Sequence, residues 1–157
     1  MNKKVFIFII ICLICLYKCF NRNEEKETFH KIEKLVQKAQ SFEGVNYRAG
    51  GTTKKGMDCS GLITTTFKSL DIKLPRSSAG MSTIGTKIPL EKIKKGDLLF
   101  FNIDRLKGKI NHVGLVTSIE EEVLFIHSTT SKGVTYSSLN ESYWKDSFVI
   151  AKRIITH

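Results

Sequence analysis

The sequence predicts an α+β domain in which helices come first and an antiparallel sheet of about five strands follows. Between residues 29 and 70, apolar residues recur at three- and four-residue steps, as in amphipathic helices. After Pro89, short apolar runs are separated by turns, as in strands. The chain has 157 residues, of which 41% are hydrophobic and 25% charged, so it suits one globular domain and excludes extensive disorder.

The N-terminal residues predict export. Two lysines precede an unbroken apolar run at residues 5–16, which is shorter than the roughly 20 residues that a membrane-spanning helix needs. A basic start followed by a short apolar run is typical of a secretory signal peptide. We therefore expect a signal peptide at 1–18, a linker at 19–28 and one domain at 29–157, located in the periplasm or cell envelope.

Three of the four cysteines lie in this N-terminal segment. Cys12 and Cys15 form a C-x-x-C inside the apolar run, where no second ligand pair is present, so we interpret them as apolar residues. Cys19 follows the run, and the tract ending there resembles the lipobox of bacterial lipoproteins, although Lys18 stands where that motif has a small residue. We expect lipid attachment at Cys19, with an uncleaved anchor or plain secretion as the alternatives.

The chain is basic, with a formal net charge of +10 that falls to +7 without residues 1–18. Outside the cytoplasm, anionic polymers of the wall and membrane surfaces are available to such a domain. The positive residues are scattered, and no helix is rich in them, so nucleic acid is not an expected partner. We expect a monomer.

Two helices are predicted in the first half of the domain. The first carries an apolar stripe and is ended by Gly44; the stripe consists of Phe29, Ile32, Leu35, Val36, Ala39 and Phe42. A turn-rich stretch from Gly50 to Gly56 follows it. The second helix is expected from Cys59 to about Leu70.

The strands are expected in the second half. The hairpin loop at Glu120–Glu122 joins two of them, so these two should pair side by side. The expected strands are Leu98–Phe101, His112–Ser118, Val123–Ser128, a short one at Val134–Ser137, and Phe148–Ile155.

Cys59 is the one cysteine outside the N-terminal segment. Asp58 and Ser60 are good capping residues, which would place Cys59 in the first turn of the second helix. Backbone N–H groups at a helix N-terminus favour the thiolate, the nucleophilic form of cysteine. A lone cysteine is otherwise a small core residue.

Two histidines decide between these interpretations. His112 opens one predicted strand and His127 ends its hairpin partner, so the two imidazoles should be cross-strand neighbours. One of them would take the thiol proton and the other would hold the first in the right tautomer. The pattern does not say which imidazole faces the thiol. An alternative that the pattern leaves open is zinc ligation by Cys59, His112 and His127.

Six motifs, in order, resemble the NlpC-type cysteine peptidases of the bacterial cell wall, most strongly the Spr-like murein endopeptidase lipoproteins. The resemblance runs from about Ala39 to Ile155 and implies a compact papain-like fold. The motifs are Tyr47–Gly51, Asp58–Leu62, Leu74–Ser78, Lys95–Leu98, His112–Gly114 and His127–Ser128, with Asn140–Trp144 before the last strand.

Carried over to this sequence, the resemblance makes Cys59 the nucleophile, His112 the general base and acid, and His127 the residue that orients it. It also implies that Tyr47 is a hydrogen-bond donor to the substrate or oxyanion, although a packed aromatic would explain it too. The remaining matches are substrate-side positions, some of which capping alone would explain: Asp58, Ser60, Arg76 and Ser77. No metal or organic cofactor is implied.

The function implied is a peptidoglycan hydrolase that cleaves amide bonds of stem peptides or crosslinks through a thiol. Two other functions suit the same fold. One is a wall-binding module without turnover, and the other is an acyltransferase in which a nucleophile other than water resolves the thioester.

Overall fold

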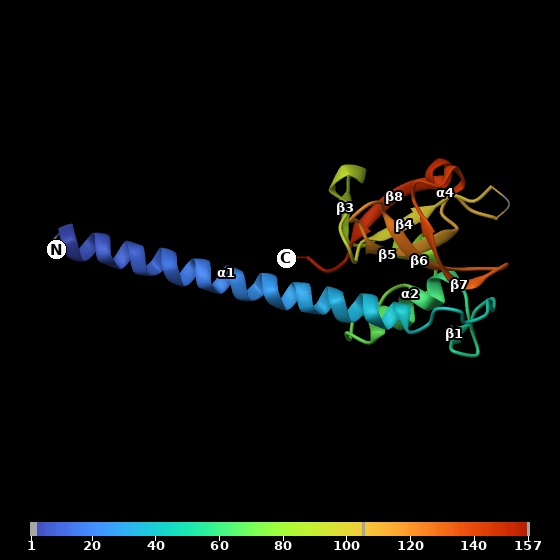
Figure 1. Cartoon of the computed structure of the whole chain (residues 1–157), viewed down its shortest axis with the longest axis horizontal. Coiled ribbons are helices and arrows are strands. Elements are labelled where there is room, and N and C mark those ends of the chain that lie inside the picture. The colour runs from blue at the N-terminus through green and yellow to red at the C-terminus, as the bar shows by residue number, and fades with distance from the viewer. Residues whose placement is uncertain (1–2, 105, 157) are drawn as a thin grey trace.

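The computed structural model describes residues 3–104 and 106–156, with side chains from residue 12 onward except those of 14–16 and 19. A single helix, α1 (Lys3–Gln40), spans 38 residues, or about 57 Å. Its N-terminal part stands clear of the rest of the chain (Figure 1). Residues 19–28, expected as a linker, are helical. The Cys19 side chain lies outside the described part, and cleavage after residue 18 stays a prediction.

No helix among the described residues combines the length and apolar character needed to cross a membrane. The domain end of α1 is the part that packs. Four residues of the apolar stripe are buried: Leu35, Val36, Ala39 and Phe42. Phe29 is 63% exposed, so the prediction that it belongs to the buried stripe is wrong. The apolar stripe is used only where α1 meets the domain. Beyond α1, Gly44 adopts a positive φ of 76° and its N–H donates to Val134 O at 2.9 Å.

The α+β prediction is confirmed, and six strands form one antiparallel sheet in the order β3-β8-β4-β5-β6-β7. Five of these strands lie close to the expected ranges. The sixth, β3, was missed by the sequence analysis. The strands are β3 (Thr86–Ile88), β4 (Leu98–Phe101), β5 (His112–Ser118), β6 (Leu124–Thr129), β7 (Gly133–Ser138) and β8 (Phe148–Arg153).

The remaining elements are short. The stretch expected only as turns forms a hairpin of β1 (Thr52–Thr53) and β2 (Gly56–Met57), which leads directly into α2 (Cys59–Lys68). The helix α3 (Ser78–Met81) lies between α2 and β3, a 3₁₀ turn (Leu90–Lys92) joins β3 to β4, and α4 (Ser142–Ser147) precedes β8. The prediction of two helices therefore missed α3 and α4.

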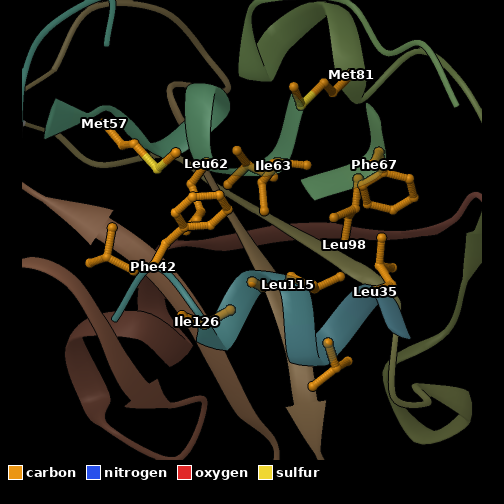
Figure 2. Packing of buried hydrophobic residues seen from close by; sticks show 14 of the residues in the cluster. Leu35, Phe42, Met57, Leu62, Ile63, Phe67, Met81, Leu98, Leu115 and Ile126 are labelled. Atoms are coloured by element: carbon orange, nitrogen blue, oxygen red, sulfur yellow. The ribbon is translucent and has the colours of Figure 1, made fainter. Parts of the chain in front are cut away.

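The sheet is covered on both faces, and β4 shows the alternation. Leu98 and Phe100 enter a core shared with α1 and α2, whereas Leu99 and Phe101 enter a second cluster with Trp144 of α4. Figure 2 shows the first core, where side chains of α1, α2 and the sheet converge. This arrangement packs α2 across one face of the sheet and places α4 over the other.

Candidate active site

A cleft of about 250 Å³ lies where α2, the start of β5 and the β6–β7 hairpin meet, and the start of α4 adds its far wall. Its lining includes Tyr47, Cys59, His112 and His127. These four predicted site residues come from four separate segments, and the fold brings them together. The other predicted site residues do not line the cleft in the described part of the chain; they are Asp58, Ser60, Arg76 and Ser77.

The N-terminus of α2 presents the thiol. Asp58 is the N-cap, and its carboxylate accepts a hydrogen bond from the Gly61 N–H at 2.6 Å, so Cys59 is the first helical residue as predicted. The loop before β1 lies tightly against this helix end. A Cβ on Gly61 would clash with the carbonyl oxygen of Gly51, which explains the glycine in this turn.

The Cys59 thiol is largely buried, and burial raises its pKa. The neighbouring Asp58 carboxylate raises the pKa further. Backbone N–H groups of Val113, Ser60 and Cys59 itself lower it, but by less. The expected effect of the helix N-terminus is therefore present and is outweighed, so the resting form is the thiol.

Beside the thiol, the Asp58 carboxylate is the centre of a polar network. Arg76 binds both of its oxygens, with Nη1–Oδ1 at 2.9 Å and Nη2–Oδ2 at 2.7 Å, and Arg76 Nη1 also donates to Ser60 Oγ at 2.7 Å. The Gly50 N–H donates to Oδ2 at 2.8 Å. Burial pushes the pKa of Asp58 upward, but the hydrogen bonds from Arg76 and from backbone N–H groups outweigh it, so the pKa is lowered.

Ser77 lies apart from this network. It is the N-cap of α3, and its hydroxyl accepts a hydrogen bond from the Gly80 N–H at 3.1 Å. The structure thus gives Arg76 and Ser77 intramolecular partners, and a direct substrate contact by either stays a prediction.

The two histidines are hydrogen-bonded, with His112 Nε2 and His127 Nδ1 2.9 Å apart. Their rings are perpendicular and buried. The predicted hairpin of β5 and β6 is confirmed, but Leu115 pairs with Ile126, so the histidines are diagonal rather than directly opposite. The register of this pairing shifts between Val116 and Ser118.

His127 is neutral because burial, followed by the charges of His112 and Lys132, lowers its pKa to about 2. Its second nitrogen, Nε2, lies 3.2 Å from Ser137 Oγ on β7. Ser137 was not among the predicted site residues. A serine in a short strand carries no local signal of this contact, since the pairing of β6 with β7 creates it.

Trp144 covers the pair and was also missed. Its ring stacks on His112 with centroids 5.3 Å apart at 28° and meets His127 edge-on at 4.6 Å and 86°. Trp144 belongs to a motif noted in the sequence, but its contacts with His112 and His127 are made by the tertiary fold and have no local sequence signal.

Tyr47 forms a parallel bridge to Met57 just before the α2 N-cap. Burial, followed by the charges of Asp58 and Cys59, raises the pKa of its phenol. The hydroxyl therefore stays protonated and can donate a hydrogen bond in the cleft. Within residues 3–104 and 106–156, no group of three or more histidine, cysteine or acidic side chains is arranged to hold a metal ion.

The chain is similar in sequence to known proteins. The chain is 44% identical over 113 residues to the probable endopeptidase NlpC homolog of Haemophilus influenzae, covering 71% of this chain and 57% of that protein. It is 36% identical over 124 residues to the murein DD-endopeptidase MepS/murein LD-carboxypeptidase of Escherichia coli K12, covering 78% and 63% respectively. The chain thus spans about three fifths of the length of these two relatives.

The fold is shared as well. A crystal structure of an NlpC/P60 family protein from Bacillus cereus matches with a TM-score of 0.72 at 32% identity, over 80% of this chain and 40% of that one. The papain-like fold and the family resemblance inferred from the sequence are confirmed. The family model described as the NlpC/P60 family matches residues 44–153, and the chain therefore belongs to the NlpC/P60 family.

Proposed function

We propose that this chain is a thiol-dependent peptidoglycan hydrolase, an endopeptidase that cleaves amide bonds in the stem peptides or crosslinks of the bacterial cell wall. The observation that carries the proposal is the cleft that holds Cys59 with the hydrogen-bonded pair of His112 and His127. A nucleophile, a base and a residue that orients the base are the parts that amide hydrolysis requires. The names of the two relatives, an endopeptidase and a murein endopeptidase, support the same class.

His112 acts as the base through Nδ1, because its Nε2 is engaged with His127. In the neutral form that can accept a proton at Nδ1, His112 carries its hydrogen on Nε2 and donates it to His127 Nδ1. The raised pKa of Cys59 means that the thiolate is not formed in advance. The thiol proton therefore moves to His112 as the sulfur attacks the amide carbonyl carbon.

The attack places negative charge on the carbonyl oxygen. The Cys59 N–H at the start of α2 and the Tyr47 hydroxyl are the donors that would stabilise it. The protonated His112 then gives its Nδ1 proton to the departing amine as the C–N bond breaks. Water, deprotonated by His112, attacks the thioester, and the acid product leaves with the thiol restored.

We propose that four residues on the substrate side of the site contact the substrate only secondarily: Asp58, Ser60, Arg76 and Ser77. The oxygens of Asp58 already accept hydrogen bonds from Arg76 and two backbone N–H groups, so a substrate amine would share the carboxylate with them. Ser60 bonds within the same network. The first effect of Asp58, Ser60 and Arg76 is to fix the α2 N-terminus, whereas Ser77 caps α3, and substrate contact is secondary.

A peptidoglycan substrate requires export, because this polymer lies outside the cytoplasmic membrane. We therefore propose processing after residue 18 and a lipid on Cys19, with a monomeric domain reaching the wall. A Cys19→Ser variant should be released from membranes in cell fractionation while wild type sediments with them. A variant that stays membrane-bound would show that an uncleaved N-terminal segment anchors the chain.

The test uses a defined muropeptide and mass spectrometry of the products, with wild type and Cys59→Ala. Hydrolysis adds the mass of water across one amide bond and identifies that bond, and Cys59→Ala should give no product. A mass increase equal to an added amine or sugar acceptor would show acyl transfer. Binding to sacculi without any product from wild type would show a wall-binding module.

A further inference from the structure

The hydrogen-bonded chain that starts at His112 does not end at His127. Ser137 lies on β7, where its strand neighbour in the pairing with β6 is Phe125. Its hydroxyl oxygen lies 3.2 Å from His127 Nε2, and the residue lines the same cleft as Cys59. His127 itself is fully buried, and among the described residues Ser137 is the one hydrogen-bonded to its second nitrogen.

The direction of these bonds follows from counting protons. A neutral imidazole has one N–H, and the charged form of His112 has two. When His112 has taken the thiol proton, its Nε2–H must donate, so His127 Nδ1 must accept. The hydrogen of neutral His127 is then on Nε2, and the Ser137 hydroxyl oxygen, 3.2 Å away, can accept it.

We propose that Ser137 is a positioning residue, whose hydroxyl oxygen accepts the Nε2–H of His127 and so supports the tautomer in which His127 Nδ1 accepts from the protonated form of His112 during the reaction. The inference rests on the proposed function, since it assigns Ser137 a part in that chemistry. In the opposite tautomer, His127 would donate to His112 Nε2. The hydrogen of His112 would then occupy Nδ1, the position that has to receive the thiol proton.

Other charged groups around the pair do not replace this bond. Within the described part of the chain, Ser137 is the residue hydrogen-bonded to His127 Nε2. The titratable groups that line the cleft with the two histidines are Tyr47, Cys59, Lys132, Glu141 and Tyr143.

The test compares Ser137→Ala, which removes the hydroxyl, with Ser137→Thr, which keeps it. Ser118→Ala makes the same change at the opposite end of β5 from His112, outside the cleft lining, and is the matched control. We expect Ser137→Ala to lower kcat roughly three- to tenfold at unchanged KM, the loss of about one hydrogen bond. Alkylation of Cys59 by iodoacetamide at neutral pH should slow by a similar factor, and Ser137→Thr and Ser118→Ala should stay near wild type.

Nitrogen-15 NMR of the histidine rings reads the tautomer directly. We expect a protonated Nε2 and an unprotonated Nδ1 for His127 in wild type, and a mixture in Ser137→Ala. A wild-type His127 protonated at Nδ1 would overturn the inference, as would a Ser137→Thr variant as impaired as Ser137→Ala. If no muropeptide is cleaved, the proposed function fails, while the NMR and alkylation results still decide the role of Ser137.

Discussion

The two halves of the cleft are held by different forces. The α2 half is polar, since the Asp58 carboxylate binds Arg76 through two hydrogen bonds and accepts from backbone N–H groups of the adjoining loop. The histidine half is aromatic, since Trp144 stacks on His112 and meets the edge of His127. The thiol lies on the polar side and its base on the aromatic side.

The difference teaches how each half is kept in its working protonation state. Hydrogen bonds from Arg76 hold the Asp58 carboxylate charged, with its pKa lowered. Burial holds His127 neutral, with its pKa lowered to about 2. The halves should therefore differ in their response to substitution, and in the pH range where each loses its contribution to stability.

The largest effect is expected where the halves meet. Cys59→Ala removes the nucleophile and His112→Ala removes the base, so each should lower kcat/KM by at least about 10³-fold. The measurement is the rate of muropeptide cleavage, with circular dichroism to confirm folding. Folded variants that retain more than a tenth of wild-type activity would contradict the assignment of these two residues.

Next comes His127→Gln, which keeps a polar side chain but removes the titrating ring. The unfolded chain binds a proton at His127 below about pH 6.5 and the folded chain does not, so wild-type stability is full above that pH and falls as pH decreases. The slope for this one group approaches about 1.4 kcal/mol per pH unit.

Urea unfolding at several pH values between 4.5 and 7 checks this prediction. His127→Gln should show a shallower loss of unfolding free energy than wild type in that range. Its kcat should fall by about 10²-fold because His112 loses its orienting partner. Equal slopes in the two proteins would mean that His127 is not neutral in the folded state.

In the polar half, Asp58→Asn keeps an N-cap but breaks the charge pairing with Arg76. We expect a loss of about 1–2 kcal/mol in unfolding free energy at pH 7. The lowered pKa of Asp58 means that its contribution is complete above the unfolded pKa of about 3.9 and disappears as pH falls through the folded value. Denaturant titrations should therefore show the wild-type advantage at pH 5 and its disappearance in stronger acid, well below the pH of about 6.5 at which the loss due to His127 begins.

The smallest effect is expected for Tyr47→Phe, which removes one hydroxyl at the cleft rim. We expect kcat to fall roughly threefold to tenfold, as for one hydrogen bond, with unchanged thermal stability, because the residue is partly exposed. A fall in melting temperature with unchanged kcat would instead indicate that Tyr47 serves as a packed aromatic.

Much of the polar half could be predicted from local sequence. A capping residue, a cysteine and an apolar helix repeat are adjacent in the chain, and α2 begins at Cys59 as expected. The proximity of His112 and His127 could also be predicted, because one hairpin joins the two strands that carry them. The diagonal offset between the two histidines could not be predicted, since it depends on the register shift near Val116.

The aromatic half depends on contacts that no local pattern shows. Trp144 sits in a six-residue helix whose N-cap, Glu141, makes no side-chain capping hydrogen bond, so neither the helix nor its place over the histidines was predicted. The edge strand β3 has three residues, too few for a clear alternation. Ser137 became identifiable only when the pairing of β6 with β7 was known.

The most direct test of the central claim is intact-protein mass spectrometry of the enzyme mixed rapidly with a defined muropeptide. The account predicts a transient adduct with the mass of the acyl fragment, located on the peptide containing Cys59 and absent from Cys59→Ala. It also predicts that the adduct decays as the hydrolysed product appears. Product formation by Cys59→Ala, or an adduct on another residue, would contradict it.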